Sequence, residues 1–387
     1  MTFISHYHTC SGDMTQGIDR GFIDTNFPSL KRMVYLNNAS TGIPPRPTIE
    51  AMKSYLDNRT EALGSFEETL STFKGIRSKL ARLLGGQASD YGFAPNTSEG
   101  LNALAHSVEY PNNSNIVICD LEFPANYVPW QNASRIYNAE LRVVQSEAGG
   151  LKIDDFENLI DSNTRVVAIS MVQFGSGYRV DIPELARIVH EHDALLAVDI
   201  IQAAGCLDID LPAIGVDFAA AQAAKWLIGP IGAGFIFVSK RIIDDLRPRY
   251  MGWWGVEDTE DFSFHQRTPA RDATKFDVGS PAMVAYAGFD KSLDILLQIP
   301  GKERERAALN TADYLREQLS EKGIDYYKFD DKNRSAIVSC SPDHVDVVQK
   351  KLEKSNIYCS VRNGRLRISP HFYNTRDEID KLLGTME

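Results

Sequence analysis

Short apolar runs alternate with amphipathic stretches along the middle of the chain. The runs are rich in Val, Ile, Ala and Phe, which is typical of strands buried in a sheet. They are 91–94, 116–119, 141–144, 165–172, 194–198, 218–221 and 234–238, and helical periodicity lies near 97–107, 126–137, 153–160 and 181–192. Strands that alternate with helices predict βαβ units and a mostly parallel sheet under helices, which is an α/β fold.

The pattern differs on either side of this region. Two amphipathic helices are predicted before it, near 48–62 and 66–84. After it come an irregular segment at 245–280 and a long helical region at 281–322 interrupted at Pro300. Strand-like runs then lie at 326–329, 336–340, 357–361 and 366–369, with helices near 343–354 and 375–384. Strand–helix–strand–strand–helix predicts a small α+β domain. The expected division is a polar, irregular N-terminal arm over 1–33, a large domain over 34–280 and a small C-terminal domain over 281–387.

Composition narrows the functional classes. The chain has 387 residues, 43% of them hydrophobic and 24% charged, as in an ordinary soluble protein of about two domains. Its net charge of −11 argues against nucleic-acid and anionic-membrane partners. We expect a cytoplasmic protein, because no apolar run could span a membrane and no secretory signal pattern is present. The five cysteines, Cys10, Cys119, Cys206, Cys340 and Cys359, lack metal-binding spacing, and we expect no metal site, including at His6, His8 and Cys10.

Two charged side chains interrupt the apolar stretch at 194–240. Asp199 ends a run that reads as a buried strand, and Lys225 lies among small and apolar residues. Taken singly, each could be structural, with Asp199 at a strand end and Lys225 reaching solvent. Burying either charge is costly unless something pairs with it. A covalently attached aromatic aldehyde cofactor would account for both, because Lys225 would form an imine and Asp199 would keep a pyridine nitrogen protonated.

The residues around this pair carry a resemblance to a known family. Asp199-x-x-Gln202, Asp217-Phe218 and Lys225-Trp226-Leu227-x-Gly229-Pro230 resemble the pyridoxal 5′-phosphate (PLP) enzymes of fold type I. Within these they resemble the class V aminotransferase family, which includes cysteine desulfurases, kynureninase and isopenicillin N epimerase. The resemblance covers roughly residues 34–387. It implies a large PLP-binding domain with a mostly parallel seven-stranded sheet, a small C-terminal domain with the arm near it, and PLP as cofactor.

The resemblance also implies the cofactor contacts. Asn96, Thr97 and Ser98 open a predicted helix, whose free N–H groups and dipole suit a phosphate. Phe123 would stack on the cofactor ring where desulfurases carry a His. Gln202 would hydrogen-bond the phenolic oxygen of the ring, a position that Gln173 could share.

Other cofactor contacts follow from segments further along the chain. Gln222 would reach the phosphate, although Ala223 and Ala224 replace the Ser and His of desulfurases. The segment Phe276–Pro281 resembles the family segment that reaches the phosphate of the neighbouring subunit. It therefore implies phosphate contacts from Gly279 and Ser280 and a homodimer with shared active sites. Trp253 resembles a kynureninase-type Trp that lines the same pocket.

The substrate-binding residues come from both ends of the chain. Arg365–Thr375 resembles the closing motif of the family, in which Arg367 would bind the α-carboxylate as a two-pronged cation. The backbone of Ala39, Ser40 and Thr41 would contact the same carboxylate.

The residues leave the reaction itself partly open. An external aldimine followed by removal of the Cα proton by Lys225 can lead to transamination, to epimerisation or racemisation, or to β-elimination as in a C–S lyase. Desulfurases need a mobile Cys on a loop before the carboxylate-binding Arg, and 361–366 contains neither loop nor Cys. We therefore predict an aminotransferase-type PLP enzyme acting on a small amino acid. Two other classes remain as alternatives, a non-catalytic PLP-binding protein and a dinucleotide-binding oxidoreductase, although the Gly232-x-Gly234 pair lacks the third Gly.

Overall fold

A seven-stranded sheet forms the centre of the larger part of the molecule. The computed structural model describes residues 18–61, 64, 66–262 and 267–386. The strand order is β2-β8-β7-β6-β5-β3-β4, and β8 alone runs antiparallel to its neighbours. The strands are β2 (Tyr91–Ala94), β3 (Asn115–Cys119), β4 (Glu140–Val144), β5 (Thr164–Ser170), β6 (Leu195–Asp199), β7 (Phe218–Gln222) and β8 (Gly234–Val238). This confirms the mostly parallel sheet that the alternating pattern predicts.

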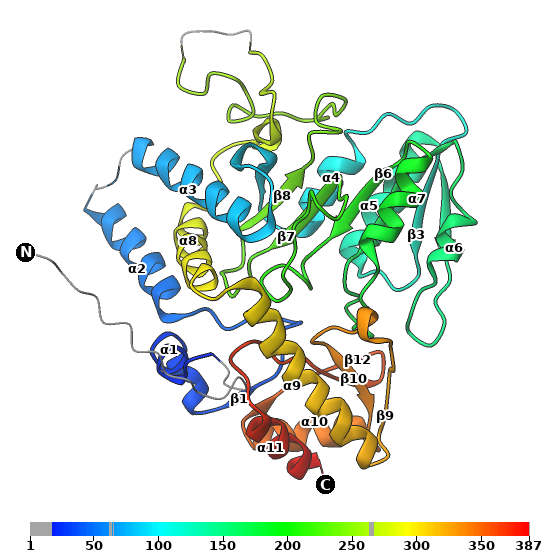
Figure 1. Ribbon diagram of the computed structural model, residues 1–387. Coiled ribbons are helices and arrows are strands. Elements are labelled where there is room, and N and C mark those ends of the chain that lie inside the picture. The colour runs from blue at the N-terminus through cyan, green and yellow to red at the C-terminus, as the bar shows by residue number, and fades with distance from the viewer. Residues whose placement is uncertain (1–17, 62–63, 65, 263–266, 387) are drawn as a thin grey trace, which may run out of the picture.

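Helices cover this sheet and enclose its two apolar faces (Figure 1). They are α2 (Arg46–Thr60), α3 (Phe66–Leu84), α4 (Thr97–Ala105), α5 (Pro124–Tyr137), α6 (Ile153–Glu157), α7 (Ile182–Glu191) and α8 (Met283–Leu297). Local sequence sets their ends: Asp181 caps α7 by accepting the Glu184 N–H, and Asn138 ends α5 in a left-handed conformation with φ 53°. Helix α8 packs against α2 and α3.

The C-terminal part carries a smaller antiparallel sheet in the order β12-β13-β10-β9. Its elements are α9 (Gly301–Glu321), β9 (Asp325–Tyr326), β10 (Val338–Ser341), α10 (Val345–Lys354), β11 (Ile357–Tyr358), β12 (Ser360–Arg362), β13 (Arg365–Ile368) and α11 (Arg376–Met386). Figure 1 shows α1 (Arg20–Asn26) and β1 (Val34–Tyr35) beside these elements, and β1 pairs in parallel with β11. Short 3₁₀ helices lie at Pro28–Lys31, Ala88–Asp90, Ala273–Phe276 and Asp331–Asn333.

Two local expectations were wrong. Part of the arm predicted as irregular is helical, because Asp19 caps α1 by accepting the N–H groups of Gly21 and Phe22. The single strand predicted at 357–361 is two, since β11 pairs with β1 whereas β12 pairs with β13. The domain boundaries remain predictions, and residues 1–17 of the arm, with His6, His8 and Cys10, lie outside the described residues. Within the described ranges, no helix is both long and apolar enough to cross a membrane.

Candidate active site

Asp199 and Lys225 lie at one edge of the large sheet. Asp199 ends β6 and Lys225 follows β7 by three residues, and the carboxyl ends of neighbouring parallel strands meet at the same edge. Asp199 is 2% exposed, and its Oδ1 accepts the Ile201 N–H at 2.8 Å. The chain at Gly42 passes so close that a Cβ there would lie 2.0 Å from the Lys225 carbonyl oxygen. Only glycine therefore fits at this crossing, which fixes the backbone around Lys225.

Burial shifts the pKa values of both groups. Desolvation raises the pKa of Asp199, and the neighbouring Glu122 raises it further, while Lys225 opposes the shift. Desolvation lowers the pKa of Lys225, an effect that Asp199 opposes and that Arg367 and Arg362 reinforce. A lysine with a lowered pKa carries more neutral amine near neutral pH, and the neutral amine is the form that attacks an aldehyde.

This shift predicts how the cofactor-free protein captures an aldehyde. The rate of PLP attachment should rise with pH, because deprotonation supplies the nucleophile, and its midpoint should lie well below the 10.5 of an ordinary lysine. Asp199→Asn should move the midpoint lower still, since it removes a charge that raises the pKa of Lys225. The rate would be followed by the absorbance of the attached cofactor. The same measurement with pyridoxal, which carries no phosphate, would show whether titration of the phosphate causes the pH dependence. A midpoint at or above 10.5 would contradict the assignment.

Phe123 lies near Lys225, and Gln202 bonds the residue that follows it. Lys225 Nζ lies 5.7 Å from the centre of the Phe123 ring, which is 44% exposed and packs edge-on against Phe174. The Gln202 amide donates to the Ala39 carbonyl at 3.0 Å and accepts from the Trp226 indole at 2.7 Å. One N–H of Gln202 remains after these bonds. An aromatic face and one amide donor therefore border the lysine.

The start of helix α4 offers donors for an anion. Asn96 is the N-cap, and its Oδ1 accepts the Glu99 N–H at 2.9 Å. Thr97 and Ser98 are the first helical residues, and the Thr97 hydroxyl is buried with no hydrogen-bond partner in the part of the chain that the structure describes. Gln222, at the end of β7, reaches the same turn through the Pro95 carbonyl at 3.4 Å. A buried hydroxyl without a partner at a helix N-terminus suits a phosphate.

Arg367 is a buried cation held by neutral oxygens. It is 2% exposed, and burial followed by the nearby Arg362 lowers its pKa to about 10. Its guanidinium donates to the Ser40 hydroxyl at 2.6 Å and to the Phe174 carbonyl at 2.8 Å. Its Nε donates to the Ser360 hydroxyl at 3.3 Å. No carboxylate of the described residues pairs with it, so an anionic ligand would offset its burial.

The loop at 39–41 lies beside Arg367, and the expected contact of its backbone with a substrate carboxylate stays a prediction. The Ala39 N–H donates to the Ser369 hydroxyl, and the N–H groups of Ser40 and Thr41 donate to the Asn37 carbonyl. These backbone donors already have partners within the chain. The Ser40 side chain, rather than the backbone, meets Arg367.

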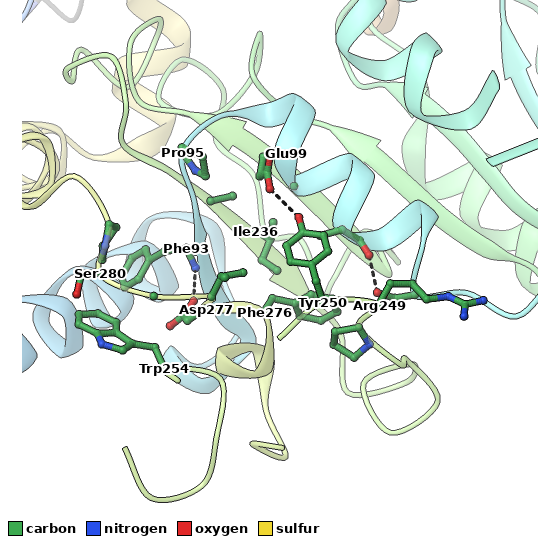
Figure 2. A pocket seen from close by; sticks show the side chains of 18 of the residues that line it. Phe93, Pro95, Glu99, Ile236, Arg249, Tyr250, Trp254, Phe276, Asp277 and Ser280 are labelled. Carbon is green, nitrogen blue, oxygen red and sulfur yellow. Dashed lines mark hydrogen bonds between the residues drawn. The ribbon is translucent and has the colours of Figure 1, made fainter. Parts of the chain in front are cut away.

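Trp253 and Gly279 lie next to each other in the chain region between β8 and α8, and Ser280 follows Gly279. Gly279 and Ser280 line a separate cavity of about 470 Å³, which extends to Phe93 and Pro95 (Figure 2). Trp253 is 44% exposed and lies beside Gly279. The segment is anchored by Asp277, which pairs with Arg77 and accepts the Phe93 N–H at 2.7 Å. Contacts of these residues with a phosphate therefore remain a prediction about a neighbouring subunit.

Glu122 is a buried acid beside this site that sequence reasoning missed. Its carboxylate accepts from the Ser170 N–H and hydroxyl and from the side chains of Asn126 and Gln173, and Cys119 Sγ lies 3.4 Å away. Burial raises its pKa, and the bonds from Ser170, Asn126 and Gln173 oppose that shift. The side-chain amide oxygen of Gln173, Oε1, has no hydrogen-bond partner among the described residues. Glu122 follows a buried strand as Asp199 does, and that signal could have found it.

Comparison with known proteins places this site in a family. The family model for class V aminotransferases matches residues 34–382. The chain belongs to the class V aminotransferase family. It is similar to a probable cysteine desulfurase of Methanothermobacter thermautotrophicus, with 29% identity across 94% of this chain and 96% of the relative. It is also similar to the uncharacterized aminotransferase YcbU of Bacillus subtilis, with 27% identity across 91% and 93%.

Solved structures of class V enzymes share the fold. An apo cysteine desulfurase from Thermococcus onnurineus aligns with a TM-score of 0.86 and 22% identity over 97% of this chain and 98% of that one. A mutant of C-DES with glycine covalently linked to its PLP cofactor aligns with a TM-score of 0.86 and 20% identity over 94% and 98%. The fold type I prediction is confirmed, and PLP is the cofactor of this class V enzyme.

The residues of this class V chain fit PLP. The partnerless Thr97 hydroxyl at the start of α4 suits the phosphate, and the buried Asp199 suits a protonated ring nitrogen. Phe123 offers a ring face, and Lys225 offers an amine with a lowered pKa. PLP, when bound, supplies an electron sink for the pair left when a bond at the substrate Cα breaks.

Proposed function

We propose that this class V enzyme removes the Cα proton of a small amino acid and acts as an aminotransferase. The observation that supports this most is the grouping of Lys225, Asp199 and Arg367, which provides an amine, a buried acid and a buried cation for a carboxylate around one site. Arg367 would bind the α-carboxylate in a two-pronged contact, because its present partners are neutral oxygens.

Each side chain would then have its own part in the reaction. Lys225 would anchor the cofactor and, once the substrate amine replaces it, its Nζ would accept the Cα proton. Asp199 would keep a positive charge on the ring nitrogen. Phe123 would cover one ring face but cannot exchange protons, so proton transfer falls to Lys225. A homodimer in the cytoplasm, with Gly279 and Ser280 reaching the partner's phosphate, belongs to the same proposal.

A second candidate is cysteine desulfurase, which the names of the relatives favour. Proteins named probable cysteine desulfurase in Methanothermobacter thermautotrophicus and Pyrococcus abyssi match 94% of this chain each, at 29% and 25% identity. Persulfide chemistry on the enzyme needs a reactive thiolate. The cysteines of the described residues are all buried, and burial raises the pKa of Cys340 and of Cys359 to about 12. Cys10 lies outside the described residues.

A product analysis tests both candidates together. The holoenzyme is incubated with a panel of amino acids, including cysteine, without a keto acid. Transamination should yield a keto acid and pyridoxamine phosphate in equal amounts, and desulfuration should yield alanine and sulfane sulfur from cysteine. Ammonia with a keto acid would indicate β-elimination, and an inverted Cα would indicate epimerisation. If the protein consumes no member of the panel and sodium borohydride fixes no cofactor on Lys225, the proposed function is wrong.

A further inference from the structure

Arg362 lies on the same sheet face as the carboxylate-binding candidate Arg367. Strands β12 and β13 form a hairpin in which Ser360 is opposite Arg367 and Arg362 is opposite Arg365. Asn363 and Gly364 make its turn with φ 51° and 73°, the positive values of a tight two-residue turn. Because side chains on one strand alternate between faces, Arg362, Ser360 and their opposite partners share a face. The hairpin therefore fixes Arg362 close to the substrate end of the site.

Arg362 has no acidic partner among the described residues. Its guanidinium donates to its neighbour's carbonyl, that of Val361, at 2.7 Å and lies 3.4 Å from the Ser40 hydroxyl. Arg365, which lies opposite Arg362 in the hairpin, is instead paired with Asp325 at 2.9 Å, and its guanidinium lies 4.2 Å from the centre of the Tyr327 ring. Arg362 is exposed, and its cationic head is free for a ligand.

The Ser40 hydroxyl connects the two cations. It accepts from Arg367 at 2.6 Å and lies within 3.4 Å of Arg362. Arg362 lowers the pKa of Arg367 and also that of Lys225, as expected for like charges held close together. An anion placed between or beside these cations would relieve the repulsion.

A small cavity adjoins Arg362. It has a volume of about 140 Å³, and its lining includes Gln173, Phe174 and Asn363. Two acids also line it, but both already have donors: Asp120 accepts from Ser146 and Glu122 is held by the network described above. Arg365 also lines it and is committed to Asp325. Of the two arginines at this cavity, Arg362 is thus the one without an acidic partner among the described residues.

We propose that Arg362 binds a second carboxylate of the substrate, so that the amino acid used by this enzyme is dicarboxylic. Arg367 takes the α-carboxylate, and the side-chain carboxylate extends toward Arg362 and its cavity. This inference rests on the proposed Cα chemistry and adds the substrate class to it. The alternative is that Arg362 and Arg367 both bind the α-carboxylate, and the two cases predict different substrates.

Binding of matched acid and amide pairs tests the inference. Holoenzyme is titrated with glutamate and glutamine, and with aspartate and asparagine, without a keto acid, and the change in cofactor absorption gives Kd. Glutarate and its monoamide, which carry no amine and cannot react, are titrated by calorimetry. Each diacid should bind about tenfold or more tightly than its amide, the effect of one hydrogen bond to a charged group. Arg362→Gln should reduce that ratio to about one and leave Kd for the amides within about twofold.

Two further variants separate the roles of the arginines. Arg187→Gln removes the same charge from helix α7, where Arg187 pairs with Glu184 and Glu191, and it should preserve the acid-to-amide ratio. Arg367→Gln should weaken the binding of acids and of amides by similar factors.

Three results would overturn the inference. The first is equal binding of acids and amides by the unchanged enzyme. The second is an Arg362→Gln variant that binds acids and amides more weakly by the same factor, which would mean that Arg362 and Arg367 both bind the α-carboxylate. The third is cysteine binding more tightly than either dicarboxylic amino acid, which would favour desulfuration and leave the Cα chemistry standing. Holoenzyme that binds no amino acid at all would overturn the proposed function, and the inference with it.

Discussion

A Lys225→Ala variant should lose turnover by at least about 10³-fold, because it removes the amine that we propose as both the anchor of PLP and the base for the Cα proton. Proton transfer by a positioned side chain contributes roughly 10²–10⁴-fold on its own. The fold should survive, since Lys225 forms no ion pair with a carboxylate of the described residues and its Nζ lies 5.7 Å from the centre of the Phe123 ring. Steady-state turnover and the melting temperature would be measured on the same preparation.

Reduction with borohydride followed by peptide mass spectrometry identifies the attachment site. In the unchanged protein the cofactor should be fixed to the peptide that contains Lys225, and in the variant to none. Lys240→Ala is a suitable control, because Lys240 is exposed and bonds only the Gln87 side chain at 3.0 Å. Label on Lys225 with unchanged turnover in the Ala variant would show that the residue anchors the cofactor without acting as the base. Full activity with no label anywhere would refute the assignment altogether.

The sequence predicts the sheet and the edge that carries Asp199 and Lys225, because both follow from local patterns. Apolar runs such as those of β3 and β8 are buried on both faces and read directly as strands. Strand ends in a parallel sheet meet at one edge, so Asp199 at the end of β6 and Lys225 just after β7 come to the same edge. The roles of Arg367 and Thr97, by contrast, came from a resemblance to the family, and the structure adds the buried settings that make them suitable.

What the sequence does not predict depends on contacts between distant segments. The Glu122 network draws donors from β3, α5 and the end of β5, and no local pattern records their convergence. Ser40 meets Arg367 across 327 positions of the chain. The division of 357–361 into two strands depends on β1, more than 300 residues earlier, pairing with the first of them. Arg362 became a candidate only once the hairpin register placed it on the face of Arg367.

An Asp199→Ala variant should lose about 10²–10³-fold in turnover, the scale expected when one preorganised electrostatic group is removed from a site. Asp199 is 2% exposed and accepts the Ile201 N–H, and no cation of the described residues forms an ion pair with it, so a charged ring nitrogen would offset its burial. Without a carboxylate there, nothing at position 199 keeps the ring nitrogen protonated, and Cα–H cleavage slows. PLP retention should change much less, because Lys225 and the start of α4 hold the cofactor at other points. Turnover and bound PLP would be measured separately.

A cofactor analogue with a methylated, permanently charged ring nitrogen makes this prediction specific. If Asp199 acts by holding that charge, the analogue should restore part of the turnover of Asp199→Ala, whose shorter side chain leaves room for the methyl group. Asp217→Asn provides the structural contrast, since Asp217 is a buried acid of the same region that binds Arg241 and His190 at 2.7 and 2.9 Å. That change should lower the melting temperature, because it weakens a buried ion pair, and the analogue should not rescue it. If Asp199→Ala and Asp217→Asn lost turnover by the same factor and the analogue rescued neither variant, Asp199 would be a residue that supports the fold.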